Sequence, residues 1–385
     1  MTTHPDRSPG ATALHDRPAG GRGEGRLRPM EIADVAAVGR LFLRHFRGIE
    51  AEPGPDLLAY LRTLAFGAPG QTRETGSCVY ERCDGRITSA LPSVHVAFRV
   101  GERDVAGRLF SAFMTDRSKD AAGAAKISLA MRARHQDLAF NDSSSPTSLK
   151  HFQAVGGTIV PIQNLEWIRT FRPAEAALGR VVRRTLRRWE PPLGPLAWPL
   201  DAAIRAVRGR SARPCRPDVR VEPMTVDDFL DHAPGLIAHH AVRPRWSRPE
   251  LAWFVAMAEQ NRRRGPLAIR RVVNRCGAVV GCFVYHGAAG RPARVLNVLA
   301  RPAQEAAILH AMLRHLDEAG CTEAIGHAQP ALMHGLAHQR GVGFRHRAFV
   351  CVLTRHADIA AAAKRGDIYI GGLAGEDWSR LMSDF

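Results

Sequence analysis

The sequence predicts an α/β protein made of two tandem copies of one domain, each a mixed, mostly antiparallel sheet flanked by helices. Internal repetition is the first observation behind this fold class: residues 27–35, LRPMEIADV, are echoed by residues 221–229, VEPMTVDDF. Two further echoes follow in the same order and at nearly the same spacing: 79–85 with 272–277, and 146–149 with 330–333. A separation this long excludes a solenoid of short stacked repeats and favours two copies of a whole fold.

Length is the second observation. The 385 residues, 45% of them hydrophobic and 24% charged, suffice for two or three domains that each bury a core. We expect a disordered tail, a first copy, a basic helical linker, a second copy and a C-terminal extension, over 1–25, 26–173, 174–218, 219–356 and 357–385. The extension carries enough apolar residues, ending in Asp377 and Trp378, to predict that it docks on the domains.

The elements of the first copy follow from periodicity and turn residues. An extended segment, 26–29, precedes a helix over 31–46 with one apolar face. A hairpin joins 77–81 to 86–91 through Asp84-Gly85, a strong turn signal. The remaining predicted elements are a strand over 105–114, a helix over 121–135, a strand over 137–140, a helix over 147–155 that stops at Gly156-Gly157, and a final strand pair over 159–162 and 165–171.

This order of elements resembles the GNAT (GCN5-related N-acetyltransferase) superfamily, in a tandem two-domain arrangement. In that resemblance Phe113 and Met114 end the splayed central strand, and Asn141 follows the next strand. Gly123, Ala124, Ala125 and Lys126 match the cofactor loop, where small residues let backbone N–H groups at a helix start approach a pyrophosphate. These seven residues are therefore our candidate cofactor-binding site.

The resemblance implies an acyl-CoA-dependent N-acyltransferase that works through its first domain, with acetyl-CoA or another acyl-CoA as co-substrate and no metal. Transfer would be direct, to the amine of a small molecule or peptide, with backbone N–H groups near Met114 polarising the thioester carbonyl. A general base must lie within reach of that amine. Asp116, Asp142, His95 and Glu50 are chemically eligible, and spacing does not choose among them.

Two departures from the family pattern support an alternative. Asp120 stands where the family loop usually has Gln or Arg, and Phe152 stands where a tyrosine often protonates the leaving thiolate. In the second copy the loop becomes 301–307, RPAQEAA, which has no glycine. The alternative is a catalytically degenerate tandem GNAT-fold binding or scaffold protein, associated with a membrane surface through its linker.

The net charge of +17 would attract polyanionic partners such as nucleic acid or an anionic lipid surface. No nucleic-acid-binding motif accompanies it, so we expect no specific nucleic-acid partner. Eleven arginines face four carboxylates in residues 172–218, and 178–189 has an apolar and a basic helical face, which would suit peripheral contact with an anionic membrane or packing on a domain. Seven scattered cysteines without a CxxC pair, and no apolar run or leader, favour a cytoplasmic location. The oligomeric state is left open.

Overall fold

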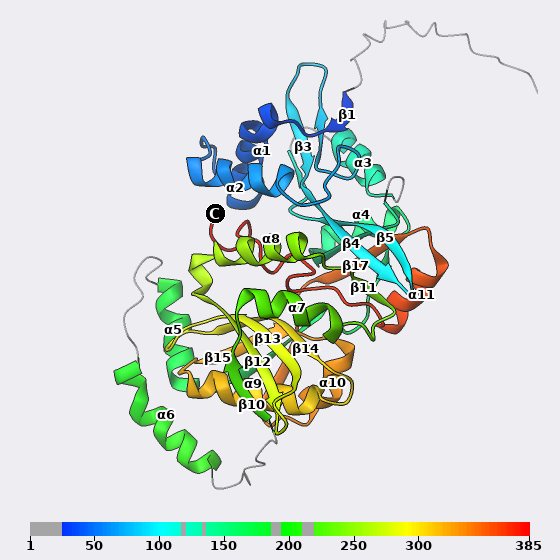
Figure 1. The fold of residues 1–385 in the computed structure, drawn as a ribbon. Helices are drawn as coiled ribbons and strands as arrows, with labels where there is room; N and C mark the ends of the chain where they lie inside the picture. Colours follow the sequence, from blue (N-terminus) through cyan, green and yellow to red (C-terminus); the bar gives the residue numbers. More distant parts are fainter. Residues whose placement is uncertain (1–24, 117–120, 133–135, 186–193, 210–218) are drawn as a thin grey trace, which may run out of the picture.

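The computed structural model describes residues 25–116, 121–132, 136–185, 194–209 and 219–385, so the tail over 1–24, Asp120 and part of the linker lie outside it (Figure 1). Mixed sheets flanked by helices make up both copies, as the sequence predicts. The N-terminal copy lies above the C-terminal copy in Figure 1, and the end of the chain lies between them. In the part of the chain that the structure describes, no helix has the length and apolar character to cross a bilayer.

The N-terminal copy opens with a strand and a helical segment and continues through a series of strands. Its elements are β1 (Arg26–Pro29), the 3-10 turn η1 (Ile32–Asp34), α1 (Val35–Phe42), the π-helical η2 (Leu43–Arg47), α2 (Pro55–Phe66), β2 (Cys78–Glu81), β3 (Ile87–Leu91), β4 (Ser93–Val100), β5 (Arg103–Phe110), β6 (Met114–Thr115), α3 (Ala121–Ala130), β7 (Leu138–Ser144), α4 (Pro146–Ala154), β8 (Thr158–Ile159) and β9 (Leu165–Thr170).

The C-terminal copy repeats this order with fewer interruptions. Its elements are β10 (Val219–Pro223), α7 (Val226–Leu236), β11 (Val242–Pro244), α8 (Arg248–Glu259), the 3-10 turn η3 (Arg262–Arg264), β12 (Leu267–Asn274), β13 (Val279–His286), β14 (Ala293–Ala300), α9 (Glu305–Glu318), β15 (Glu323–His327), α10 (Pro330–Ala337), β16 (Val342–His346), β17 (Phe349–Thr354) and α11 (Ala357–Arg365). The three sequence echoes fall at matching places: β1 with β10, the end of β2 with the end of β12, and the start of α4 with the start of α10.

The two copies exchange their last strands. In the N-terminal copy β17 lies between β7 and β8, whereas in the C-terminal copy β9 lies between β15 and β16. The predicted pairing of 159–162 with 165–171 is therefore wrong, because β8 and β9 belong to different sheets. The domain boundaries at 173 and 219 stay predictions, since each sheet includes a strand from the other half of the chain.

The strand predicted over 105–114 is also divided. β5 ends at Phe110 and β6 begins at Met114, where it pairs with β3. Between them Ala112 has a φ of 43°, a left-handed conformation that turns the backbone away from the line of β5. Pro92 separates β3 from β4, and these two strands lie in different sheets. Neither β4 nor α2 was predicted from the sequence.

Helices cover both faces of the N-terminal sheet that contains β2 and β3. Val79 of β2 packs in the core that contains α1 and α2, whereas its neighbours Cys78 and Tyr80 pack with Ile127 of α3 and with Met131, just after α3. Because successive strand residues point to opposite faces, α1 and α2 cover one face and α3 the other.

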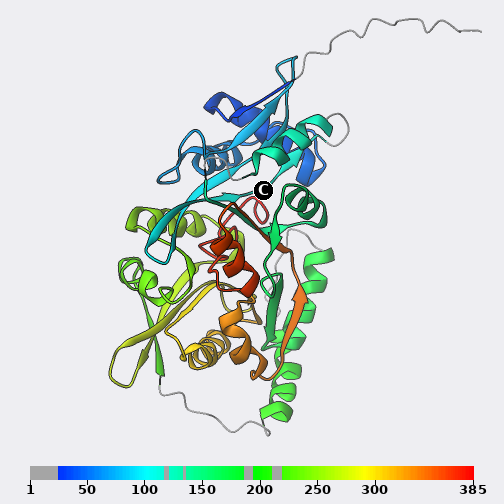
Figure 2. The same ribbon diagram turned by 90° about the vertical axis from the view of Figure 1, so that its right-hand side faces the viewer.

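The linker contains two helices, α5 (Pro173–Thr185) and α6 (Gly194–Gly209) (Figure 2). Asp201 of α6 accepts hydrogen bonds from the N–H groups of Ala174 and Glu175, at 2.8 and 3.1 Å, so it joins α6 to the start of α5. On the predicted apolar face Leu178 and Val181 are exposed. Membrane contact through 178–189 stays a prediction, and part of that segment lies outside the described residues.

Candidate functional site

A cavity of about 240 Å³ opens where β5 and β7 separate. These parallel strands pair from Gly107 to Leu109 and then diverge, because the chain after β5 turns toward β3 while β7 continues along β17. Phe110, Ser111, Ala112 and Phe113 form the wall on the β5 side. We call this space the N-terminal fork cavity.

The other walls of the N-terminal fork cavity come from both faces of the sheet. Met131, just after α3, and Phe152 of α4 line it on one face, and His45 and Phe46 of η2 line it on the other. The rings are closely arranged: the centroids of Phe110 and Phe152 are 6.0 Å apart. The cavity is therefore lined by residues from both faces of the sheet.

Asn141 holds the base of the fork. Its Nδ2 donates a 2.6 Å hydrogen bond to the backbone oxygen of Phe110, which ties the end of β7 to the end of β5. Its Oδ1 accepts from the backbone N–H of Ser143 at 2.9 Å and from the hydroxyl of Ser144 at 2.7 Å. All three partners lie at the cavity wall, so the amide fixes the width of its base.

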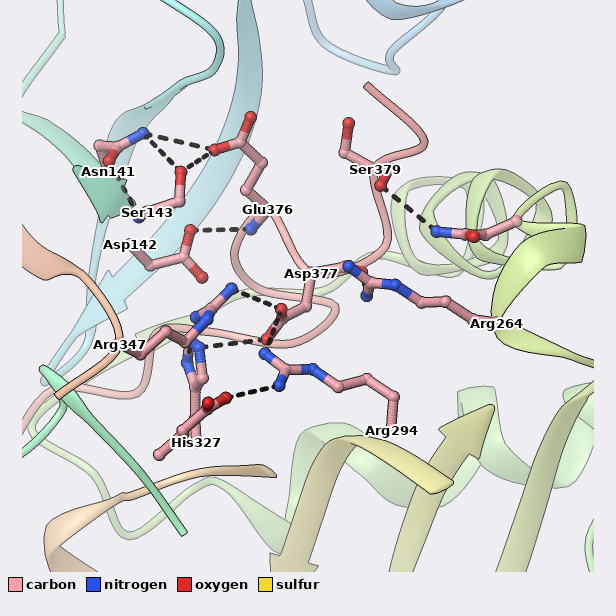
Figure 3. A network of polar contacts seen from close by, with 12 residues as sticks. Asn141, Asp142, Ser143, Arg264, Arg294, His327, Arg347, Glu376, Asp377 and Ser379 are labelled. Carbon is pink, nitrogen blue, oxygen red and sulfur yellow. Dashed lines mark hydrogen bonds and ion pairs between the residues drawn. The ribbon is translucent and has the colours of Figure 1, made fainter. Parts of the chain in front are cut away.

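One charged wall residue comes from the C-terminal extension. Glu376 reaches the fork and accepts hydrogen bonds from the hydroxyls of Ser111 and Ser143, one on each side of it; Figure 3 shows the bond from Ser143. Its side chain is buried, and burial raises the pKa of the Glu376 carboxyl, although the two hydroxyls partly offset this effect.

Behind Glu376, the carboxyl group of Asp142 holds the extension by its backbone. Asp142 Oδ1 accepts a 2.9 Å hydrogen bond from the N–H of Glu376, while Oδ2 is buried without a hydrogen-bond partner (Figure 3). Burial, and next the negative charge of Asp377, raise the pKa of Asp142 to about 7.

Asp377 is the centre of a buried ion network (Figure 3). Arg347 and Arg294 pair with its Oδ1 at 2.7 and 3.0 Å, and His327 Nε2 lies 3.3 Å from its Oδ2. Burial opposes ionisation of Asp377, but the positive groups outweigh it and hold its pKa well below the usual range. Burial, together with the charge of Arg347, lowers the pKa of His327 to about 3.

Asp142, His327 and Asp377 also have the composition of a metal-ligand set. One oxygen or nitrogen from each lies within 4.8 Å of the other two, in the part of the chain that the structure describes. However, Arg294 and Arg347 already neutralise Asp377, so the network needs no added cation for charge balance. A proton on Asp142 fits this electrostatic environment better than a divalent ion.

The corresponding fork in the C-terminal copy is filled. β14 and β15 pair only from Ala293 to Val295, and beyond that point the side chain of Asn297 binds the extension. Its Nδ2 donates to the hydroxyl of Tyr369 at 2.7 Å, and its Oδ1 accepts from the N–H of Leu373 at 2.8 Å. Leu373 is fully buried there. The prediction that the extension docks is confirmed, and it docks in the second fork.

The seven predicted cofactor-binding residues do not form one cluster. Phe113 and Asn141 line the N-terminal fork cavity. Met114 is buried in β6, where it pairs with Ala90. The remaining four, Gly123, Ala124, Ala125 and Lys126, lie in the first half of α3 and outside the cavity wall, with Gly123 buried and Lys126 exposed.

Glu376, Ser111 and Ser143 were not identified from the sequence. The extension has no counterpart in the repeat, so no echo pointed to Glu376. One signal was present in the sequence: Glu376 and Asp377 are adjacent acids in an otherwise apolar segment that was expected to dock. Buried acids in such a segment need partners, which makes them candidates for a site.

No protein-family model matches this chain, and no curated protein matches it in sequence. Solved structures similar to it in fold include the following two. A probable N-acyltransferase from Enterococcus faecalis V583 matches with a TM-score of 0.56 and 10% identity, over 88% of this chain and 74% of that one. A GCN5-related N-acetyltransferase from Anabaena variabilis ATCC 29413 matches with a TM-score of 0.55 and 8% identity, over 86% of this chain and 72% of that one.

Proposed function

We propose that this chain, whose fold is that of the GNAT superfamily, is an acyl-CoA-dependent N-acyltransferase whose N-terminal copy carries the reaction. One observation supports the choice of copy. The fork between β5 and β7 encloses a cavity, whereas the fork between β14 and β15 is occupied by the chain's own extension. The co-substrate we propose is acetyl-CoA, and transfer is direct, to a primary amine.

The fork suits an extended thioester. Backbone that leaves a sheet ladder exposes N–H and C=O groups, which can bind an amide-containing chain laid between the strands. The backbone N–H groups of Ala112 and Phe113 lie beyond the paired part of β5 and are the proposed donors to the thioester carbonyl. Phe110 and Phe152 provide an apolar surround for the acyl group.

The start of α3 is the proposed site of the CoA pyrophosphate. A helix N-terminus favours an anion, and Gly123, Ala124 and Ala125 are small enough for close approach. α3 is also joined to α4, which carries the wall residue Phe152, by Ser128, whose hydroxyl lies 2.7 Å from Nδ1 of His151. The assignment of Gly123, Ala124, Ala125 and Lys126 to the cofactor stays a prediction.

A second function is favoured by one observation in the N-terminal copy. Phe152 gives the N-terminal fork cavity no hydroxyl at the position of the family's usual acid. In the C-terminal copy the fork is filled, so that copy serves as a scaffold for the extension under either function. The alternative for the whole chain is a binding protein that takes up a CoA-like ligand without turning it over.

Calorimetry with acetyl-CoA tests the proposal. Ser148 of α4 lines the cavity, and a Ser148→Trp variant should fill it and abolish binding. The matched control is Thr147→Trp, on the same helix but exposed and outside the cavity wall, which should bind as the wild type does. No binding by a folded wild-type protein would overturn the proposal. Binding without release of CoA, whatever amine is supplied, would support the alternative.

A further inference from the structure

The N-terminal fork cavity contains a carboxylate supplied by another part of the chain. Glu376 is 5% exposed and forms part of the cavity wall. Its two oxygens accept from Ser111, directly after β5, and from Ser143 of β7, and Asn141 Nδ2 lies 3.5 Å from one of the two oxygens. The carboxylate is therefore held at the point of the fork, where strands, cavity and extension meet.

We infer that Glu376 accepts the proton of the attacking amine in the N-terminal fork cavity, an inference that rests on the proposed acyl transfer. Two serine hydroxyls stabilise its ionised form, while burial raises the pKa of the carboxyl, so it binds a proton more readily than an exposed glutamate. The backbone N–H of Glu376 is fixed by Asp142, which keeps the carboxylate in place.

The four bases considered from the sequence fit the geometry less well. Asp142 faces the extension and does not line the cavity, nor do Asp116, His95 and Glu50. Glu50 is exposed and pairs with Arg44, which also lies 3.4 Å from Asp116. Of the described wall residues, the other titratable side chain is His45, whose Nδ1 lies 3.0 Å from the backbone oxygen of Thr115. His45 is therefore the competitor that an experiment must exclude.

The reaction step balances with Glu376 as the base. At neutral pH ethanolamine enters as an ammonium ion, which gives one proton to the Glu376 carboxylate. The freed amine nitrogen bonds to the thioester carbonyl carbon, and the carbonyl π electrons move onto the oxygen. When these electrons return, the carbon–sulfur bond breaks, and the CoA thiolate leaves with the electron pair of that bond and takes the second proton from the nitrogen. The products are an amide and CoA thiol, and Glu376 returns its proton to solvent.

The test measures CoA release from acetyl-CoA with ethanolamine, hydroxylamine or water as acceptor, in wild type, Glu376→Gln and His45→Gln. Glutamine keeps the size of Glu376 and its oxygen can accept one of the two serine hydrogen bonds, while its NH2 group must donate to the other serine; it cannot accept a proton. We expect Glu376→Gln to lower kcat with ethanolamine by about 10²–10⁴-fold and to remove the acid limb of its pH profile, with the calorimetric Kd for acetyl-CoA unchanged. Hydroxylamine is unprotonated at neutral pH and depends less on a base. With hydroxylamine as acceptor, kcat of Glu376→Gln should therefore fall much less than it does with ethanolamine.

A matched control is Glu323→Gln. Glu323 is another buried glutamate, paired with Arg180 at 3.1 Å in the C-terminal sheet and away from the cavity, so its substitution should change neither kcat nor the pH profile. Loss of the acid limb in His45→Gln but not in Glu376→Gln would overturn the inference. An equal loss of kcat in Glu376→Gln with ethanolamine and with hydroxylamine would also overturn it. A wild type that binds acetyl-CoA but acylates neither amine overturns it as well, while one that binds no acetyl-CoA refutes the proposed function itself.

Discussion

The backbone N–H of Glu376 donates a 2.9 Å hydrogen bond to Oδ1 of Asp142, so the strand that forms one side of the fork also holds the C-terminal extension. The neighbours of Asp142 in β7, Asn141 and Ser143, line the cavity. Strand β7 therefore connects the cavity to the buried ion network around Asp377. We expect substitutions in that network to alter the positions of the cavity residues on β7.

The first prediction concerns pH. The pKa of Asp142 is raised from 3.8 to about 7, so the folded protein keeps a proton that the unfolded chain releases. Its contribution to stability is complete below about pH 4 and is lost as the pH rises to about 7. Asp142→Asn should remove this loss, and the variant should gain stability relative to wild type between those two pH values.

Urea unfolding of both proteins at several pH values checks this prediction. The difference between the two proteins reports the proton on Asp142 and its coupling to Asp377, because titratable groups outside this network act equally in both. A difference that does not change with pH would show that Asp142 is ionised in the folded protein.

The second prediction concerns the ion network. Arg294→Met removes one of the two arginines paired with Asp377, whose side chain is completely buried. Leaving a buried charge under-compensated costs about 3–5 kcal/mol, which urea unfolding measures. Arg345→Ala is the control: it pairs with Glu166, but its side chain is 60% exposed, so its loss should cost less than about 1 kcal/mol. Equal costs would contradict the account.

The third prediction concerns the way the extension fills the second fork. Gly372 has a φ of 60°, and a Cβ there would collide with the backbone oxygen of Leu296. Gly372→Val should displace the extension, lower the stability by about 2 kcal/mol or more and, through Glu376, reduce CoA release. Limited proteolysis should then cut the extension faster. Gly343→Ala, where a Cβ meets no atom within 4 Å, should behave as wild type.

The fourth prediction concerns the exchanged strands. A protease site inserted within residues 210–218 allows the linker to be cut after folding. The two halves should stay together on gel filtration, because β9 is hydrogen-bonded to β15 and β16 while β17 is hydrogen-bonded to β7 and β8. Trp167 of β9, completely buried in the C-terminal core, adds apolar contact. Separation of the halves without denaturant would refute the exchange.

Much of the local structure could be predicted from the sequence. The hairpin between β2 and β3 follows from Asp84 and Gly85, and Gly85 has the φ of 77° that the turn requires. The helix α4 begins and ends where Pro146 and Gly156 indicate, within two residues. These features depend on a few residues that are neighbours in the sequence, so they do not require knowledge of the tertiary contacts.

The fork could be predicted only in part. Phe113 was identified at the end of the predicted strand 105–114 and Asn141 directly after the strand 137–140, and the structure places both at the cavity. Glu376 lies more than two hundred residues from Asn141 in the chain, and no local pattern relates the two. Their meeting depends on how the extension packs.

The sequence by itself determined that one fold occurs twice, because the repeat requires only that matching residues recur in matching order. Only the tertiary structure decided which copy keeps an open fork. Tyr369 and Leu373 occupy the second fork through Asn297, and the chain then carries Glu376 onward to the first. The physical reason is that strand exchange and docking of the extension are long-range events, set by the burial of apolar side chains and the pairing of buried charges across both copies.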